Sequence, residues 1–146
     1  MIEGPYELPA GWRWVRLGEV AWRDVKVVTP SELPDATFSY LGMGNVSAGQ
    51  WQEPEPTEIE GRFLKGQTIS FREGLVLFGK LRPYLNKVVV PSHDGVASPE
   101  FVPIAMDEDV LAPKYLGTFL RSPIFVGYAS RTVRGSRQPR VPLGAL

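Results

Sequence analysis

Proline and glycine recur along the whole chain, and they limit the length that a regular element can reach. The 146 residues include 15 Gly and 14 Pro. Proline lacks a backbone donor and glycine weakens the interior of helices and strands, so both favour short elements joined by turns. The chain is nevertheless 43% hydrophobic and has four Trp, which is enough for a packed core. These features predict one globular domain of short elements and argue against a helical bundle.

The apolar patterns before residue 107 are typical of strands. Alternating or β-branched runs cover residues 12–17, 38–43, 68–71, 76–78 and 88–90. Glu19–Trp22 could form one helical turn, and residues 47–61 are expected to be an exposed loop or an edge. The apolar run 96–106 contains Pro99 and Pro103, so we expect it to be an edge strand or a bent strand.

The region after Met106 has the pattern of two short helices. Pro113 suits a first helical position, and the following apolar residues share one helix face, namely Tyr115, Leu116, Phe119 and Leu120. Ser122 and Pro123 suit the cap and first position of a second helix. The predicted fold is therefore α+β, a mixed and strand-rich single domain with two short helices near the C-terminal third.

Charge is distributed unevenly along a chain whose formal net charge is zero. Residues 1–60 contain four Lys or Arg against ten Asp or Glu, a net of −6, and residues 61–146 contain twelve against six, a net of +6. From Lys114 onward there are six basic residues and no acidic one. Such a chain can present a basic face to phosphates, unless folding intermixes the two halves.

The stretch 77–90 combines two apolar runs with a basic and aromatic connection. We expect Val76–Phe78 and Val88–Val90 to be strands, and Pro83 to favour an extended Arg82. The connection then presents a group of polar and aromatic side chains: Lys80, Arg82, Tyr84, Asn86 and Lys87. Cations, an aromatic ring and an amide suit a nucleic acid. A solvated surface turn is an equally good interpretation of this pattern alone.

Catalytic patterns are weak in this sequence. The single histidine, His93, lies in a turn, and nothing local supports pairing it with Ser98 as base and nucleophile. The acidic stretch 107–109 precedes a helix, where it is favoured by the helix dipole, and is not expected to bind metal. The chain has no Cys, no signal-peptide pattern and no apolar run of membrane-spanning length. We therefore expect a cytoplasmic binding protein without catalysis, cofactor, metal or membrane partner.

Several motifs together resemble the target recognition domain of type I restriction-modification specificity subunits. The resemblance runs from about residue 8 to the end, and residues 8–146 are expected to form this domain. The matching segments, in the order of the family, are 8–12 with 17–20, 40–46, 80–87, 97–102, 115–122 and 135–141. The family continues into a long spacer helix and a second domain, which are absent from this sequence.

The resemblance implies sequence-specific binding of double-stranded DNA without catalysis. In the family each such domain reads one half of a split DNA site. The implied partners are DNA, a modification (methyltransferase) subunit that methylates adenine, and a restriction subunit of the same phage-defence system. Docking of the methyltransferase is in doubt for this chain, because it would use the long helix.

The resemblance also separates residues that grip the DNA from residues that read it. Family members read different sequences, so the shared motifs suit phosphate contacts or scaffold roles. Base readout is expected outside these motifs, in residues 23–37, 47–63 and 129–134. The side chains there that address adenine or guanine edges are Gln50, Gln52, Arg62, Arg131 and Arg134. Arg82 and Arg137 could instead pair with Glu100 or Asp94. The candidate DNA-binding residues are Lys80, Arg82, Tyr84, Asn86, Lys87, Arg131, Arg134, Arg137, Gln138 and Arg140.

Three other functions stay open on the sequence alone, of which a small hydrolase using Ser98 and His93 has the weakest support. The chain could be the recognition domain of a fused restriction-methyltransferase enzyme. It could also be a protein-interaction module that keeps the fold without binding DNA, which its neutral net charge would suit.

Overall fold

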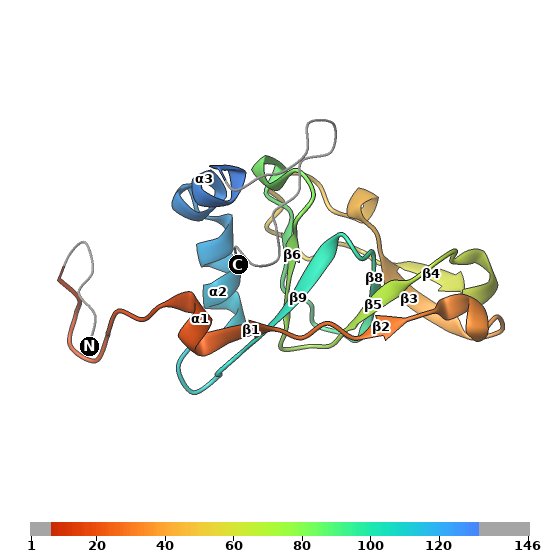
Figure 1. Ribbon diagram of the computed structural model, residues 1–146, viewed down its shortest axis with the longest axis horizontal. Coiled ribbons are helices and arrows are strands. Elements are labelled where there is room, and N and C mark those ends of the chain that lie inside the picture. The colour runs from red at the N-terminus through yellow and green to blue at the C-terminus, as the bar shows by residue number, and fades with distance from the viewer. Residues whose placement is uncertain (1–6, 132–146) are drawn as a thin grey trace.

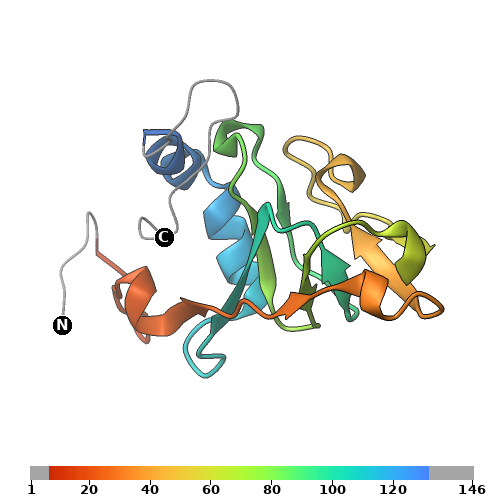
Figure 2. The ribbon, with the colours of Figure 1, turned by 45° about the vertical axis from the view of Figure 1, so that its right-hand side comes forward.

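Two small sheets and a pair of helices stack in three layers (Figure 1 and Figure 2). The computed structural model describes residues 7–131. The first sheet has the strand order β1 (Ala21–Arg23), β9 (Phe101–Met106), β6 (Val76–Gly79) and β7 (Val88–Val89). The second has the order β2 (Val27–Val28), β5 (Thr68–Phe71), β8 (Gly95–Ala97), β3 (Thr37–Leu41) and β4 (Thr57–Glu60).

All strand pairs are antiparallel except β3 with β8. The α-helices among the described residues are α1 (Leu17–Val20), α2 (Pro113–Arg121) and α3 (Pro123–Arg131). Four short 3-10 helices lie in connections: η1 (Pro30–Glu32), η2 (Met43–Asn45), η3 (Gly61–Phe63) and η4 (Pro83–Leu85). The predicted α+β class, with two helices near the C-terminal third of a single strand-rich domain, is confirmed.

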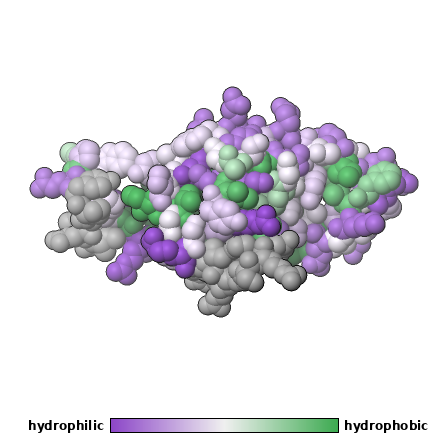
Figure 3. All heavy atoms as spheres, turned by 90° about the horizontal axis from the view of Figure 1, so that it is seen from above, coloured by the Kyte–Doolittle hydropathy of each residue, from purple (hydrophilic) through white to green (hydrophobic). Residues whose placement is uncertain are grey.

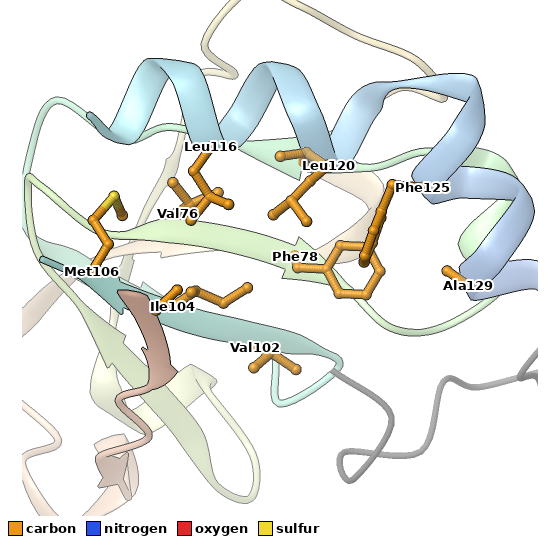
Figure 4. Packing of buried hydrophobic residues seen from close by; sticks show 11 residues of the cluster. Val76, Phe78, Val102, Ile104, Met106, Leu116, Leu120, Phe125 and Ala129 are labelled. Carbon is orange, nitrogen blue, oxygen red and sulfur yellow. The ribbon is translucent and has the colours of Figure 1, made fainter. Parts of the chain in front are cut away.

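Three strands of the first sheet, β9, β6 and β7, are buried on both faces, because their side chains alternate between two cores. Val76 and Phe78 of β6 face α2 and α3, where Leu116 and Phe125 pack against them (Figure 4). Leu77, between them, belongs instead to the second core, shared with side chains of the second sheet such as Leu41, Ile69, Phe71 and Ala97. The domain is therefore held together through the middle layer, which contacts both of its neighbours.

The expectation that residues 96–106 form an edge or bent strand is wrong in part. The run splits into β8 and β9, and β9 is a central strand whose six residues are all buried. The carbonyl of Pro103 accepts a hydrogen bond from the Asp24 amide (2.9 Å), just after the end of β1. In an antiparallel sheet the nitrogen and carbonyl of one residue face the same neighbouring strand, so the nitrogen of Pro103, which has no hydrogen to donate, also faces β1 and not β6. The ladder between β9 and β6 loses no hydrogen bond to this proline.

The expectations for the N-terminal third also need correction. Residues 12–16 form no strand, and Leu17 and Gly18 already belong to α1. Ala21 and Trp22, expected in a helical turn, instead begin β1 and pair with Met106 and Ala105. The expected strands near 38–43, 68–71, 76–78 and 88–90 are present, and residues 47–61 end in the edge strand β4.

No helix within residues 7–131 combines the length and apolar character required to cross a membrane.

Candidate nucleic-acid interface

The predicted hairpin with a polar connection is present. β6 and β7 pair antiparallel, and the Gly79 amide donates to the Lys87 carbonyl (2.8 Å), which closes the base of the connection 80–87. The Lys80 amide donates to the carbonyl of Glu100 (3.0 Å), which ties the connection to the segment before β9. The segment therefore leaves and re-enters the sheet at fixed points.

Left-handed residues stand at both ends of η4. Arg82 (φ 48°, ψ 67°) and Asn86 (φ 54°, ψ 56°) lie in the left-handed region. The expectation that Pro83 holds Arg82 extended is therefore wrong. The 3-10 turn compensates for the unfavourable backbone, because the amides of Leu85 and Asn86 donate to the carbonyls of Arg82 and Pro83 (2.9 Å each).

The five polar and aromatic side chains of this connection divide into two groups. Arg82 and Tyr84 are exposed, Lys80 is half-buried, and the side chains of Lys80 and Arg82 form no ion pair within residues 7–131. Asn86 Nδ2, in contrast, donates to the Arg121 carbonyl (3.1 Å), and Lys87 Nζ donates to the Met43 carbonyl (2.8 Å). The side chains of Asn86 and Lys87 are therefore engaged within the fold, whereas those of Arg82 and Tyr84 are open to solvent.

The loop 47–52 lies beside this connection although it is distant in sequence. The Gly49 amide donates to the carbonyls of Leu85 (3.0 Å) and Asn86 (3.1 Å). Gln50 is used within its own loop, because its Oε1 accepts from the Ser47 amide (2.8 Å) and its Nε2 donates to the Gln52 carbonyl (2.9 Å). The predicted base-reading residue Gln50 thus stabilises the loop, and its neighbours Trp51 and Gln52 are exposed.

The corner between α2 and α3 completes this surface. The guanidinium of Arg121 lies over the Trp51 ring, 4.8 Å from its centroid, and Arg121 Nη2 donates to the Val88 carbonyl (3.1 Å). Burial lowers the pKa of the Arg121 guanidinium, which still remains charged at neutral pH. Ser122 Oγ accepts from the Phe125 amide (3.3 Å) and caps α3, as predicted.

We call the surface formed by residues 47–52, 80–87 and 121–131 the loop face. Arg131, predicted as a DNA contact, is exposed in the last turn of α3 and belongs to this face. Figure 3 looks onto the end of the molecule where α3 and η4 lie in Figure 1, and it shows mainly hydrophilic side chains with separate apolar patches. The loop face thus combines cations with exposed aromatic rings.

Parts of the other predicted base-reading segments lie together away from the loop face, at one end of the second sheet. Residues 30–37 and 57–63 meet there, since η1 packs against η3 and β3 pairs with β4. Residues 27–28 instead form β2, at the other edge of the second sheet. Arg62 forms ion pairs with Asp35 and with Glu60 (3.2 Å). Exposed carboxylates surround this end, and they belong to Glu32, Asp35, Glu58 and Glu60. An acidic end with a paired arginine is poorly suited to phosphates.

His93 is tied to Glu53 and not to a nucleophile. Glu53 Oε2 lies 3.2 Å from His93 Nδ1 and accepts from the Ser92 amide (2.9 Å), and Glu53 Oε1 accepts from Ser92 Oγ (2.6 Å). These hydrogen bonds join the loop between η2 and β4, which contains Glu53, to the turn before β8. No cluster of three or more His, Asp or Glu within the described ranges is placed to hold a metal ion.

Four predicted site residues lie outside the described residues, and they are Arg134, Arg137, Gln138 and Arg140. Sequence reasoning missed Trp51 and Arg121, whose contact joins positions 70 residues apart. The one signal in the sequence is that Trp51 lies in a polar stretch with two prolines, where an exposed loop is expected.

Comparison with known proteins gives matches of one kind. No protein-family model matches the chain. The EcoDI type I restriction enzyme specificity subunit of Escherichia coli is 23% identical over 134 residues, which cover 92% of this chain and 29% of that protein. The EcoEI specificity subunit of the same organism is 27% identical over 149 residues, covering 96% of this chain and 24% of that protein.

Solved structures agree with these relatives. The crystal structure of the HsdS subunit from Thermoanaerobacter tengcongensis matches with a TM-score of 0.80 and 31% identity, covering 99% of this chain and 38% of that one. Over nearly its whole length the chain is similar to type I specificity subunits. A chain from a structure of type I restriction-modification complex assembly matches with a TM-score of 0.79 and 28% identity, covering 96% of this chain and 37% of that one. The chain spans about a quarter of the length of the curated relatives that it matches.

Proposed function

We propose that this chain is a target recognition domain that binds double-stranded DNA sequence-specifically and reads one half of a split site for a type I restriction-modification complex. The observation that carries the proposal is the loop face, where Lys80, Arg82 and Arg131 accompany exposed Trp51 and Tyr84. Cations suit phosphates and exposed rings suit bases, so the two groups support grip and readout on one surface. The homology to specificity subunits supports the same role.

The proposal assigns no catalysis to this chain. Its partners would be duplex DNA together with the modification and restriction subunits of the same system, as the names of the matched proteins suggest. The acidic end of the second sheet would then lie away from the phosphates, because like charges repel there.

Salt dependence of duplex binding tests this function. About five phosphate contacts predict a slope of roughly −4 to −5 in a plot of log affinity against log salt concentration. Lys80→Ala should weaken binding to all sequences alike and make the slope shallower by about 0.9. Fluorescence anisotropy of a labelled duplex measures both. A folded chain that shows no salt-dependent duplex binding, even at low salt, would contradict the proposal.

A further inference from the structure

Trp51 is the most exposed aromatic side chain of the loop face, with 61% of its surface open to solvent. A Trp side chain carries a large apolar surface, and a ligand that covers this surface gains binding free energy. The side chain of the preceding Gln50 does not shield it, because it is held in hydrogen bonds of its own loop.

The position of Trp51 is fixed before any ligand arrives. Arg121 covers one face of the ring, and its guanidinium is held in turn by the Val88 carbonyl in β7. The loop backbone is anchored at Gly49 on the carbonyls before β7. A large rigid side chain that is already ordered loses little conformational entropy on binding.

The free part of the ring suits a base edge. Because a guanidinium occupies one ring face, the indole cannot be sandwiched between two base pairs. Its other face and its edge remain open for a lateral apolar contact. Among the groups that base edges present in the major groove, the C5-methyl of thymine is the apolar one. Gln52, next in the chain and exposed, carries an amide of the kind that addresses adenine, the partner of thymine.

We propose that Trp51 is a specificity-determining residue that contacts a thymine methyl group of duplex DNA, with Arg121 as the positioning residue behind it. The inference rests on the proposed function, since it requires that the loop face meets DNA. The cations of the same face favour DNA over a protein as the partner of the ring. Lys80 and Arg82 would hold the backbone, and Trp51 would select the sequence.

Selection from a randomised duplex pool, made with the 146-residue chain, tests the inference. Trp51→Ala should lose the preference for thymine at one position of the selected motif and bind the wild-type motif roughly 5- to 50-fold more weakly. The slope against salt should stay unchanged, because no charge is removed. Trp22→Ala is the matched control: Trp22 is 54% exposed on β1, outside the loop face, and its removal should leave the motif intact.

Replacing that thymine by uracil removes only the methyl group. Wild-type binding should fall about fourfold, whereas Trp51→Ala should not distinguish the two duplexes. Trp51→Phe, which keeps a ring, serves as a second variant and should keep part of the preference. Circular dichroism verifies that each variant is folded.

The outcomes separate the two proposals. If the wild-type chain binds duplexes and enriches a motif that Trp51→Ala enriches equally, the role of Trp51 is wrong and the proposed function stands. Equal wild-type affinity for thymine and uracil at every position overturns the methyl contact. If the wild-type chain enriches nothing and binds no duplex, the proposed function itself fails, and the role of Trp51 with it.

Discussion

Lys80 and Lys87 lie at the two ends of one connection, yet removal of the Lys87 ammonium should lower stability and removal of the Lys80 ammonium should weaken DNA binding. Lys87 Nζ donates to the Met43 carbonyl at 2.8 Å, whereas the Lys80 side chain has no ion-pair partner within residues 7–131. Lys87→Met keeps most of the aliphatic stem and removes the ammonium. The expected loss is about 1.5 kcal/mol, the lower end for a hydrogen bond to a charged group, because Lys87 is only half-buried.

That loss corresponds to a fall in melting temperature of about 3–6 °C for a domain of this size. The slope of DNA affinity against salt should change little in Lys87→Met. Lys80→Met, the matched control, should change stability by less than about 0.5 kcal/mol and make the slope shallower by about 0.9. Thermal unfolding and anisotropy titrations give both quantities. If Lys87→Met is as stable as wild type and flattens the slope, the division of these cations is wrong.

Three further predictions concern stability. Burial opposes ionisation of the Glu53 carboxyl, but the hydrogen bonds from Ser92 and His93 outweigh it and lower its pKa. The stabilisation by ionised Glu53 is therefore present above its unfolded pKa and is lost as pH falls through the lower folded pKa. The difference in unfolding free energy between wild type and Glu53→Gln, measured by urea unfolding, should shrink on acidification, and a constant difference would refute this. Phe125→Ala, at a buried ring 5.6 Å from Phe78, should cost about 3–5 kcal/mol, whereas Ile124→Ala, at an 81% exposed position, should cost less than about 0.5 kcal/mol; equal melting temperatures for the two would count against the packing of α3. Gly61→Ala would place a methyl group on the carbonyl oxygens of Leu33 and Pro30 and should lower the melting temperature strongly, while Gly44→Ala, with open space around it, should not; tolerance of both would show that η1 and η3 do not pack as described.

The elements with a clear local pattern were predictable from the sequence. β6, β7, α2 and α3 follow from apolar alternation, helical spacing and the Ser122–Pro123 cap, which are properties of neighbouring residues. The buried position of β9 was not, because the rule that places Pro103 at an edge is local. Its exception depends on where β1, which is 80 residues away, happens to end.

The exposed residues of the candidate site were predictable from the sequence, but the hydrogen bonds and ion pairs that engage other polar residues within the fold were not. The exposure of Arg82 and Tyr84 matches the polar pattern of residues 80–87. The internal roles of Asn86 and Lys87 depend on the carbonyls of Arg121 and Met43, which tertiary folding brings to them. The ion pair of Arg62 with Asp35 likewise spans 27 positions, and no local pattern signals it.

The proposed function requires that duplex DNA contacts the loop face. Hydrogen–deuterium exchange of the chain with and without duplex DNA tests it most directly, because backbone amides report contact segment by segment. With DNA bound, we expect slower exchange in residues 47–52 and 80–87 and in α3, and no change in residues 30–37 and 57–63. Protection confined to the acidic end of the second sheet, with the loop face unchanged, would contradict this expectation.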